Sequence, residues 1–371
     1  MPYIWQNSDW PQFTWNQDKF DGKLAEFEQL ALLTDNLLNQ LQKKVREQTA
    51  IELLASEALH TSLIEGEKFD IQDLRDKCGE ALKHAQSDAG TRDANGDVVS
   101  LVFQARYDFN LTLTSERLCK WQEMAIAKTS AFHKVERGKC RTHAEPMQIV
   151  SGAIGMETVH YEAPPSSAVP GEMERFLDWF NGSTALPGIL RAGIAHFYFE
   201  CIHPFEDGNG RVGRAISDLA LSQALGRPVL MSLSKTIFER RNSYYDALSQ
   251  SQSSSLDLTD WLNWFADAAV SAQKDAIELM QFLAGKELFW EKYEGRFNDR
   301  QVTILERMLK EGPQGFQGGM SAKKYAKLAI CSYELAQADL AYLMDVGAMH
   351  HCMDEGRPDR FEITLPSLDS E

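Results

Sequence analysis

Residues 190–202, LRAGIAHFYFECI, are apolar on almost every side of a helix. A helix without a polar face has to be enclosed by other elements, so we interpret this stretch as a buried central helix. It is followed directly by the pair His203-Pro204 and then by two closely spaced glycines, Gly208 and Gly210. The sequence therefore predicts a helix end, a tight loop and a new helix start at the centre of the fold.

The rest of the chain is predicted to be mainly α-helical. Between Asp21 and Ala85, leucines recur every three or four residues, as an amphipathic helix requires, and Gly66 is interpreted as a helix stop. We expect the first twenty residues to form an extended arm and 251–257 to form a loop. Further helices are predicted at 102–109, 115–127, 172–181, 211–225 and 258–282, with two short strands within 149–161.

A length of 371 residues suggests two or three domains. We predict an N-terminal helical module at 1–88, a domain around the central helix at 89–292 and a small C-terminal domain at 293–371. The last of these reads as helix, turn, helix and hairpin, which is the layout of a winged helix.

The chain carries 38 lysines and arginines against 54 aspartates and glutamates, a formal charge of −16. This charge argues against a protein that holds DNA or an anionic membrane by bulk attraction, although it leaves room for a local basic pocket. The sequence shows no apolar run long enough to span a membrane. Residues 1–10, MPYIWQNSDW, lack the basic end and apolar run of a signal peptide, so we do not expect one there. Its six scattered cysteines contain no CxxC pair, so we expect a cytoplasmic protein rather than a disulfide scaffold.

The loop after the central helix reads HPFEDGNGRVGR over 203–214. Gly208 and Gly210 allow successive backbone N–H groups to point at one spot, and such a nest at a helix N-terminus binds anions. Arg211 and Arg214 are three residues apart and can face the same side, which suits a polyphosphate. Asp207 is the expected magnesium ligand, because magnesium on nucleotides takes one or two protein carboxylates plus phosphate oxygens.

His203 lies at the mouth of this loop and can act as a base near neutral pH. A histidine after an apolar helix is usually structural, and an Asp-Gly-Asn-Gly stretch alone is usually a turn. The combination of a base, a metal ligand, a phosphate nest and two guanidiniums instead predicts phosphoryl or nucleotidyl transfer.

The twelve-residue motif resembles the signature of Fic-domain proteins of the Fic/DOC superfamily, and the resemblance covers about residues 100–285. It implies a Fic-type helical bundle with a β-hairpin flap. It also implies a protein adenylyltransferase that moves AMP from ATP to a serine, threonine or tyrosine hydroxyl of a target protein, with modification of the chain itself as an open alternative. The implied roles are a base for His203, a Mg²⁺ ligand for Asp207, a phosphate cradle for Gly208, Asn209 and Gly210, and neutralisation of the polyphosphate for Arg211 and Arg214. A base that must be neutral predicts activity that falls below about pH 6.5.

Further nucleotide contacts are implied by the same resemblance. The hairpin within 149–161 resembles the family flap, which aligns the target by β-addition, and Ser151 and Gly152 are expected nearest the nucleotide. Tyr244 and Tyr245 match paired tyrosines that border the adenine pocket of relatives, with ordinary aromatic packing as the alternative. Gln252 falls where relatives often carry a polar adenine contact, although the sequence alone slightly favours a solvated loop residue.

The segment from Thr61 to Gly66, TSLIEG, resembles the inhibitory motif of the family. In relatives the glutamate of this motif pairs with the second arginine of the signature, so Glu65 is expected to pair with Arg214 and to remove the arginine that orients the γ-phosphate. Taken alone, the segment is a helix end with one acid. In some relatives the same glutamate positions water for the reverse reaction, deAMPylation.

The two ends of the chain resemble a small N-terminal module and a winged-helix tail found in a bacterial subset of Fic proteins. The predicted recognition helix at 332–346 contains acidic residues and no lysine or arginine, so we expect protein contact or a structural role rather than DNA reading. Basic residues elsewhere in this domain could still touch phosphates: Lys323, Lys324, Lys327, Arg357 and Arg360.

Two alternatives to AMP transfer stay open: a Fic domain that uses another donor, and a winged-helix regulator with a non-catalytic Fic domain. The expected ligands are ATP and Mg²⁺. A homodimer is also among the expectations, because many relatives dimerise.

Overall fold

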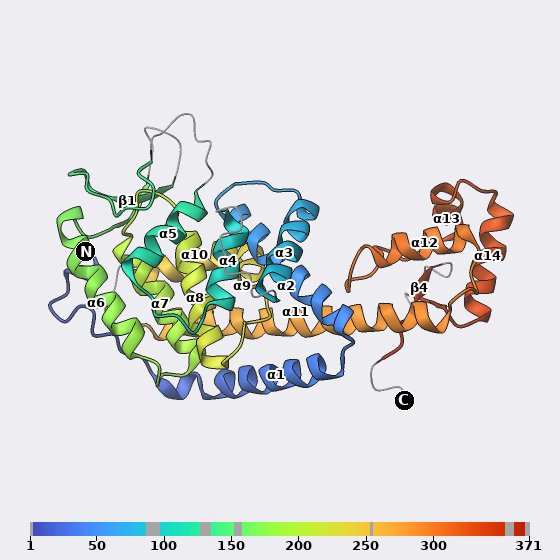
Figure 1. The fold of residues 1–371 in the computed structure, drawn as a ribbon, viewed down its shortest axis with the longest axis horizontal. Helices are drawn as coiled ribbons and strands as arrows, with labels where there is room; N and C mark the ends of the chain where they lie inside the picture. The colour runs from blue at the N-terminus through green and yellow to red at the C-terminus, as the bar shows by residue number, and fades with distance from the viewer. Residues whose placement is uncertain are drawn as a thin grey trace. The chain divides into compact units, whose positions relative to one another are not determined.

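The structure is a computed structural model that describes residues 3–86, 97–126, 135–151, 158–252, 255–352 and 360–367. As predicted, the fold is mainly α-helical (Figure 1), with fourteen α-helices and two pairs of short strands in the described residues. None of the helices in this part of the chain is long and apolar enough to span a membrane.

Helices of the N-terminal half and the hairpin come first in the chain. They are α1 Asp21–Gln40, α2 Lys43–Ile64, α3 Ile71–Gln86, α4 Val98–Tyr107, α5 Ser115–Ala125, β1 Gln148–Ser151, β2 Thr158–Glu162 and α6 Val169–Gly182. The remaining elements are α7 Gly188–Ile202, α8 Asn209–Leu225, α9 Leu233–Glu239, α10 Arg241–Gln252, α11 Thr259–Lys292, α12 Asp299–Leu309, α13 Ala322–Leu328, α14 Tyr333–Asp345, β3 Met349–His351 and β4 Phe361–Ile363.

The chain divides into two compact units, one made of 1–32 and 50–274, the other of 33–49 and 275–371. The boundaries fall inside α1, α2 and α11. Compact units are defined by contacts, whereas the predicted domains are defined by sequence. The predicted division into 1–88, 89–292 and 293–371 therefore stays a prediction.

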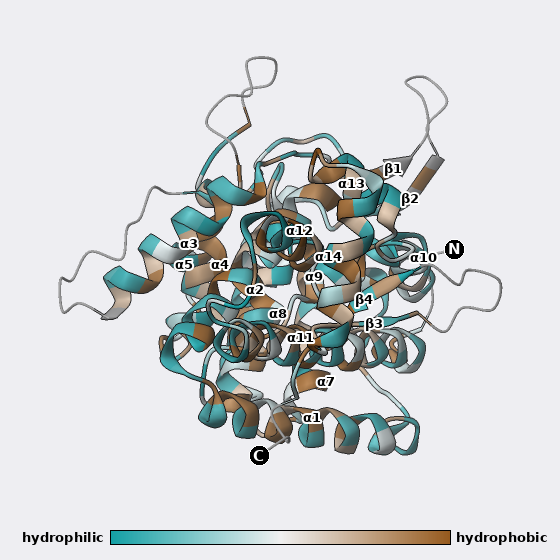
Figure 2. Cartoon of the chain, turned by 90° about the vertical axis from the view of Figure 1, so that its right-hand side faces the viewer, coloured by the Kyte–Doolittle hydropathy of each residue, from teal (hydrophilic) through white to brown (hydrophobic). Residues whose placement is uncertain are grey.

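Helix α7 forms the centre of the first unit, as the apolar pattern predicted. Every residue from Ile189 to Ile202 is buried, and the part of α7 in view in Figure 2 is brown, the colour of hydrophobic residues. Helix α8 packs along α7 and also contacts α4 and α5. The helix that starts at the predicted phosphate nest is therefore held by the most buried part of the fold.

A second packing cluster joins α2, α3 and α4, with Leu54, Leu74 and Val102 among its buried members. The N-terminal arm packs on this unit. Trp5 Nε1 donates a hydrogen bond to Glu162 O at 2.7 Å, and Trp10 Nε1 donates one to Glu172 Oε2 at 2.9 Å.

Buried charges connect α2 to the helix that carries the motif. Arg106 on α4 donates from Nε to Asp218 Oδ2 on α8 at 2.7 Å, and its Nη2 lies 3.3 Å from Glu57 Oε2 on α2. Glu57 in turn accepts from Ser234 N on α9 at 3.1 Å. Removing one partner of such a network leaves an uncompensated buried charge, which is strongly destabilising. The network therefore fixes α2 against α8.

The predicted hairpin is confirmed at the level of its strands. β1 and β2 are antiparallel, pairing Gln148 with Glu162 and Ser151 with Thr158, and the register shifts between Ile149 and Val150. Gly152 lies outside the described residues.

Two helices between 233 and 252 were not predicted. Helix α10 extends to Gln252, so the predicted loop at 251–257 begins two residues too early along the chain. Gln252 is 2% exposed. Reading it as a solvated loop residue is therefore wrong, because the polar pair Ser251 and Gln252 is the buried end of α10.

The C-terminal elements are three helices, α12 to α14, followed by the paired strands β3 and β4, where the sequence predicted helix, turn, helix and hairpin. They enclose a core of their own that includes Leu305, Tyr325 and Leu340. Asp339 on α14 is 6% exposed and accepts hydrogen bonds from Tyr325 Oη and Arg300 Nε, both at 3.0 Å. This acid of the predicted recognition helix is thus an internal hydrogen-bonding centre. Arg357 lies outside the described residues.

Candidate functional site

The loop between α7 and α8 begins and ends with left-handed backbone. His203 terminates α7 with φ 49°, and its N–H donates to Phe199 O at 2.9 Å. Gly208 has φ 87° and is the N-cap of α8. Left-handed backbone is easy for glycine but uncommon for a histidine, so the His203 conformation requires support from its surroundings.

Asn209 holds the loop through its side chain. Its Oδ1 accepts from Phe205 N at 3.0 Å and its Nδ2 donates to Phe205 O at 2.8 Å. The residue is 3% exposed. The side-chain amide is thus committed to the loop, which leaves the backbone N–H groups as the means by which this position would meet a phosphate.

The His203 ring is half-buried beside a buried acid. Its Nδ1 lies 3.6 Å from Glu200 Oε2, one helical turn earlier on α7. Burial lowers the pKa of His203 to about 4, and the positive charge of Arg141 adds to this effect. The imidazole is therefore neutral at physiological pH, the form that can accept a proton.

Glu200 is 5% exposed and lines the same cavity as His203. Burial raises the pKa of its carboxyl to about 8, the negative charge of Glu65 acts in the same direction, and Arg214 opposes them. A carboxyl in this state is mostly protonated at neutral pH. The site thus pairs a neutral base with a neutral acid.

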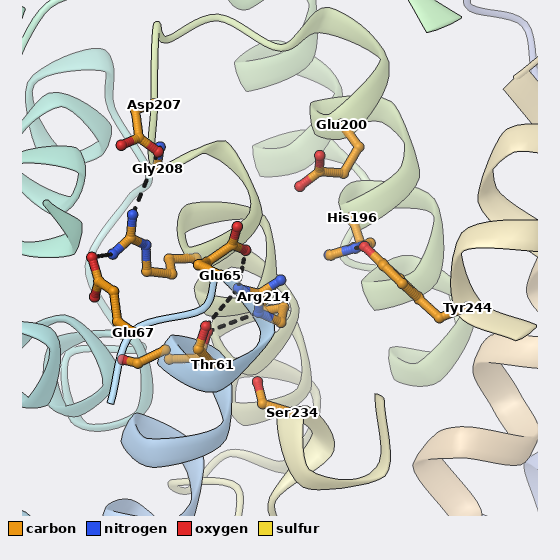
Figure 3. Close-up of polar contacts among 12 residues, drawn as sticks. Thr61, Glu65, Glu67, His196, Glu200, Asp207, Gly208, Arg214, Ser234 and Tyr244 are labelled. Carbon is orange, nitrogen blue, oxygen red and sulfur yellow. Dashed lines mark hydrogen bonds and ion pairs between the residues drawn. The ribbon is translucent and has the colours of Figure 1, made fainter. Parts of the chain in front are cut away.

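Residues from the end of α2 surround Arg214, as Figure 3 shows. Arg214 Nε donates to Thr61 Oγ1 at 2.8 Å, while its Nη2 donates to Thr61 O at 2.9 Å and to Glu65 Oε1 at 2.7 Å. Burial alone would raise the pKa of Glu65, but the charge and hydrogen bond of Arg214 outweigh it and the pKa is lowered. Glu65 is therefore ionised in this contact, and the predicted pair is present in the geometry.

The same segment supplies a second carboxylate. Glu67 Oε1 lies 2.7 Å from Arg211 Nη1, and Arg211 is 3% exposed. Asp207 Oδ1 lies 3.5 Å from Arg211 Nη2. Both arginines of the motif are thus paired with acids that follow α2. Figure 3 marks the ion pair of Glu67 with a dashed line.

The carboxylate of Glu65 also occupies the space above Gly210. A Cβ atom at Gly210 would lie 2.5 Å from Glu65 Oε1. A side chain at this position would collide with the acid, so glycine is required here for close approach.

A cavity of about 540 Å³ brings seven of the predicted residues together. Its lining comprises Glu65, Ile149, Glu200, His203, Gly210, Arg214, Asn242, Tyr244, Tyr245, Asp246, Leu248, Ser249 and Gln252. A pocket of this size fits a small organic ligand. Gly208, Asn209, Arg211 and Asp207 lie beside it on the motif, and Ser151 is the last residue of β1.

The two tyrosines differ in their surroundings. Tyr244 is 3% exposed and its hydroxyl lies 2.8 Å from His196 Nε2, so it is part of the core. Tyr245 is 48% exposed and its ring lies edge-on to that of Tyr244 at 5.1 Å. Tyr245 thus offers an accessible aromatic ring at the cavity wall.

Asp207 presents a half-exposed carboxylate at the start of α8, where its Oδ1 accepts from Gly208 N at 2.5 Å. Within the described residues there is no cluster of three or more His, Cys, Asp or Glu side chains that would hold a metal alone. One carboxylate beside a phosphate nest fits a Mg²⁺ ion that takes most of its ligands from a nucleotide and water.

Sequence reasoning did not single out Glu67, Glu200 or Arg141. Glu200 could have been found, because it is an acid in a helix that is otherwise almost wholly apolar and it precedes His203 by one turn. Glu67 lies beyond the end of the periodic pattern, and Arg141 contacts residues 23 to 62 positions away in sequence. No local pattern reveals either of the last two.

Comparison with known proteins adds two family matches. Residues 112–221 match the Fic/DOC family, and residues 3–83 match a domain of unknown function, DUF4172. The first region contains the hairpin, α7 and the whole motif, and the second contains the segment with Glu65.

Two curated relatives are similar over part of their length. A probable protein adenylyltransferase of Aquifex aeolicus is 29% identical over 103 residues, which is 28% of this chain and 30% of the relative. Protein adenylyltransferase Fic of Drosophila willistoni is 30% identical over 166 residues, 43% of this chain and 30% of the relative. The similarity thus spans less than a third of each relative. Among solved structures, a Fic family protein from Desulfovibrio desulfuricans G20 matches with a TM-score of 0.46 and 19% identity, over 94% of this chain and 97% of that one.

Proposed function

The chain contains a Fic/DOC family domain preceded by a DUF4172 module, and on this premise we propose that it is a protein adenylyltransferase that transfers AMP from ATP to a hydroxyl of a target protein. One observation carries the proposal. A neutral His203, the nest at the start of α8 and the guanidinium of Arg214 meet at one cavity of about 540 Å³. Relatives named protein adenylyltransferase support the same reaction class.

His203 acts as the base. It removes the proton from the target hydroxyl, the hydroxyl oxygen forms a bond to the α-phosphorus, and the bond from that phosphorus to the β-phosphate oxygen breaks so that pyrophosphate leaves. Its low pKa makes His203 available as an acceptor but a weak base. The loop therefore contributes mostly by positioning the hydroxyl and by stabilising phosphate charge.

The other predicted residues bind the nucleotide. The backbone at Gly208, Asn209 and Gly210 cradles phosphate oxygens, and Arg211 and Arg214 neutralise their charge. Tyr245 stacks on or borders the adenine and Gln252 contacts its edge, whereas Tyr244 shapes the pocket from behind. Asp207 would hold Mg²⁺, and the ion would supply positive charge to offset that of the phosphates. Contacts from Ser151 and Gly152 stay predictions.

The segment after α2 inhibits this reaction in the free protein. Glu65 holds Arg214 at 2.7 Å and Glu67 holds Arg211 at 2.7 Å, so both guanidiniums that ATP needs are occupied by carboxylates. A triphosphate has to displace these acids before its γ-phosphate can be oriented. The sequence predicted only the pair of Glu65 with Arg214, and the pair of Glu67 with Arg211 is added to it here.

The test uses ATP labelled at the α- or the γ-phosphate with wild-type protein and two variants, Glu65→Gly and His203→Ala in the Glu65→Gly background. Label from the α-phosphate alone should appear on protein in Glu65→Gly, and the His203 variant should show none. A charge-assisted hydrogen bond is worth about 1.5–3 kcal/mol, which corresponds to a rate increase of roughly 10- to 150-fold over wild type.

Each other outcome has a definite meaning. Label from the γ-phosphate would assign a kinase, and no label from either position would favour the non-catalytic regulator. Equal rates for wild type and Glu65→Gly would reject inhibition by Glu65. The reverse reaction is tested by adding wild-type protein to the purified, labelled product and following release of AMP.

A further inference from the structure

Arg141 is a buried arginine that contacts the backbone of the catalytic loop. It is 1% exposed. Its Nε donates to His203 O at 2.7 Å, and its Nη2 donates to Ile202 O at 3.2 Å. The N–H of Arg141 itself donates to Pro204 O at 2.9 Å. Three successive carbonyls around His203 are thus bound by one residue.

The other half of the guanidinium binds the segment that follows the hairpin. Nη2 also donates to Pro164 O at 2.6 Å, and Nη1 donates to Ser166 Oγ at 3.0 Å. A lysine has one ammonium group and cannot span both sides, whereas the planar fork of arginine has five donors in fixed directions. The contacts therefore use the particular shape of arginine.

This binding pattern meets a specific need of the loop. His203 has left-handed backbone with φ 49°, a conformation that costs free energy in a residue with a side chain and persists only where surrounding contacts enforce it. Carbonyls that turn away from the end of a helix also lack partners within that helix. Arg141 supplies hydrogen-bond donors to these carbonyls and thereby holds the left-handed backbone of His203 in place.

We propose that Arg141 is a positioning residue for catalysis, which holds the backbone of His203 in its left-handed turn through contacts with three successive carbonyls. The inference goes beyond AMP transfer as such, because it assigns a role to a residue outside the motif. Arg141 is absent from the cavity lining, so it acts through His203 and does not contact the nucleotide.

The charges around His203 support this role. Burial and the positive charge of Arg141 both lower the pKa of the imidazole, while the negative charge of Glu65 and the backbone carbonyl of Glu200 act in the opposite direction. The Glu200 carboxyl, whose pKa is about 8, also faces the ring from α7. Among these groups Arg141 is the cation that opposes protonation of the base.

Two variants separate shape from charge. Arg141→Lys keeps a positive charge but loses the fork, and Arg141→Gln loses both. The first measurement is the pKa of His203 by NMR of protein labelled at its nine histidines, with the His203 signal assigned from a His203→Ala sample. Arg141→Gln should raise this pKa by about one unit, and Arg141→Lys should leave it close to wild type. This measurement does not depend on the proposed function.

The second measurement does rest on the proposed function, and it follows AMP transfer in the Glu65→Gly background. Both variants should lower kcat, Arg141→Gln by about 100-fold, because misplacement of a reacting group by about 1 Å has an effect of that size. The KM for ATP should stay within about twofold, since Arg141 is not part of the nucleotide cavity. The signal of buried His196 serves as an internal check that each variant is folded.

An unchanged His203 pKa in folded Arg141→Gln would overturn the contact of the guanidinium with His203, and an unchanged kcat in either folded variant would overturn the positioning role. If Arg141→Gln does not fold, Arg141→Lys decides: a lower kcat at unchanged KM and unchanged melting temperature supports the proposal, and a fall in melting temperature with unchanged kcat rejects it. Loss of AMP transfer already in the Glu65→Gly parent would reject the proposed function and leave the NMR result to decide for Arg141.

Discussion

At the scale of single residues, His203 differs most from its sequence-based expectation. An ordinary histidine predicts activity that declines below about pH 6.5. Burial and Arg141 instead lower the pKa of His203 to about 4. A base is lost only when pH falls below its own pKa, so the acidic decline should move down toward pH 4. The negative charge of Glu65 raises the pKa of His203, so removing that charge should move the decline to a slightly lower pH still.

This prediction is checked by measuring kcat/KM for ATP with the Glu65→Gly variant from about pH 5 to pH 9. The acidic side should be flat above about pH 5. A change near pH 8 is expected from Glu200, whose pKa is raised to about 8 by burial, and Glu200→Gln should remove it. A half-maximal rate near pH 6.5 would show that His203 is solvated during turnover and would contradict the prediction.

At the scale of elements, α2 and the seven residues around its end form the proposed inhibitory device. Glu57 anchors the helix to Arg106, and the last turn delivers Thr61 and Glu65 to Arg214. Because the anchor is buried, the helix body cannot swing away without exposing unpaired charges. Release of the inhibition is therefore expected to be a local movement, confined to the residues after Ile64.

Glu67 gives this element its own prediction. In the Glu65→Gly background, Glu67→Gln should raise AMP transfer further, because Arg211 then loses its 2.7 Å ion pair. The pair is partly exposed, so the gain should be small, about two- to fivefold, and should decrease with added salt. The measurement is the initial rate with limiting ATP. The exposed Glu80 on α3 provides a matched control, since Glu80→Gln should leave the rate unchanged. A lower rate in the Glu67 variant would instead assign that acid to productive binding.

At the scale of the whole molecule, the charge of −16 and the acidic α14 predict that the chain does not bind DNA. Lys324, one of the basic residues near α14, donates to Gln317 O and Gly319 O, both at 3.0 Å, and is thus engaged within its own domain. Anisotropy of a labelled DNA duplex at about 150 mM salt should show only weak association, at about 10⁻⁴ M or above. Binding tighter than about 10⁻⁶ M that weakens on Lys323→Glu would contradict this.

Local patterns predicted much of this molecule. The apolar run before His203, the glycines of the loop and the stop at Gly66 each depend on neighbouring residues, and each lies where it was predicted. Helix α10 was missed, because its serines and glutamine resemble a loop until burial by other elements is known. The pairing of Arg211 with Glu67 and the clamp by Arg141 join distant segments, and no spacing rule encodes such contacts. Homodimer formation stays a prediction.

The contact between Glu65 and Arg214 has a consequence for how inhibition scales. The carboxylate belongs to the same chain as the arginine, so it behaves as a tethered ligand whose effective concentration is set by the chain between them and not by the amount of protein. Dilution cannot relieve such a competitor, and only the level of free nucleotide can oppose it. The protein would then need a higher ATP concentration for half-maximal activity, by a constant factor that does not depend on how much protein is present.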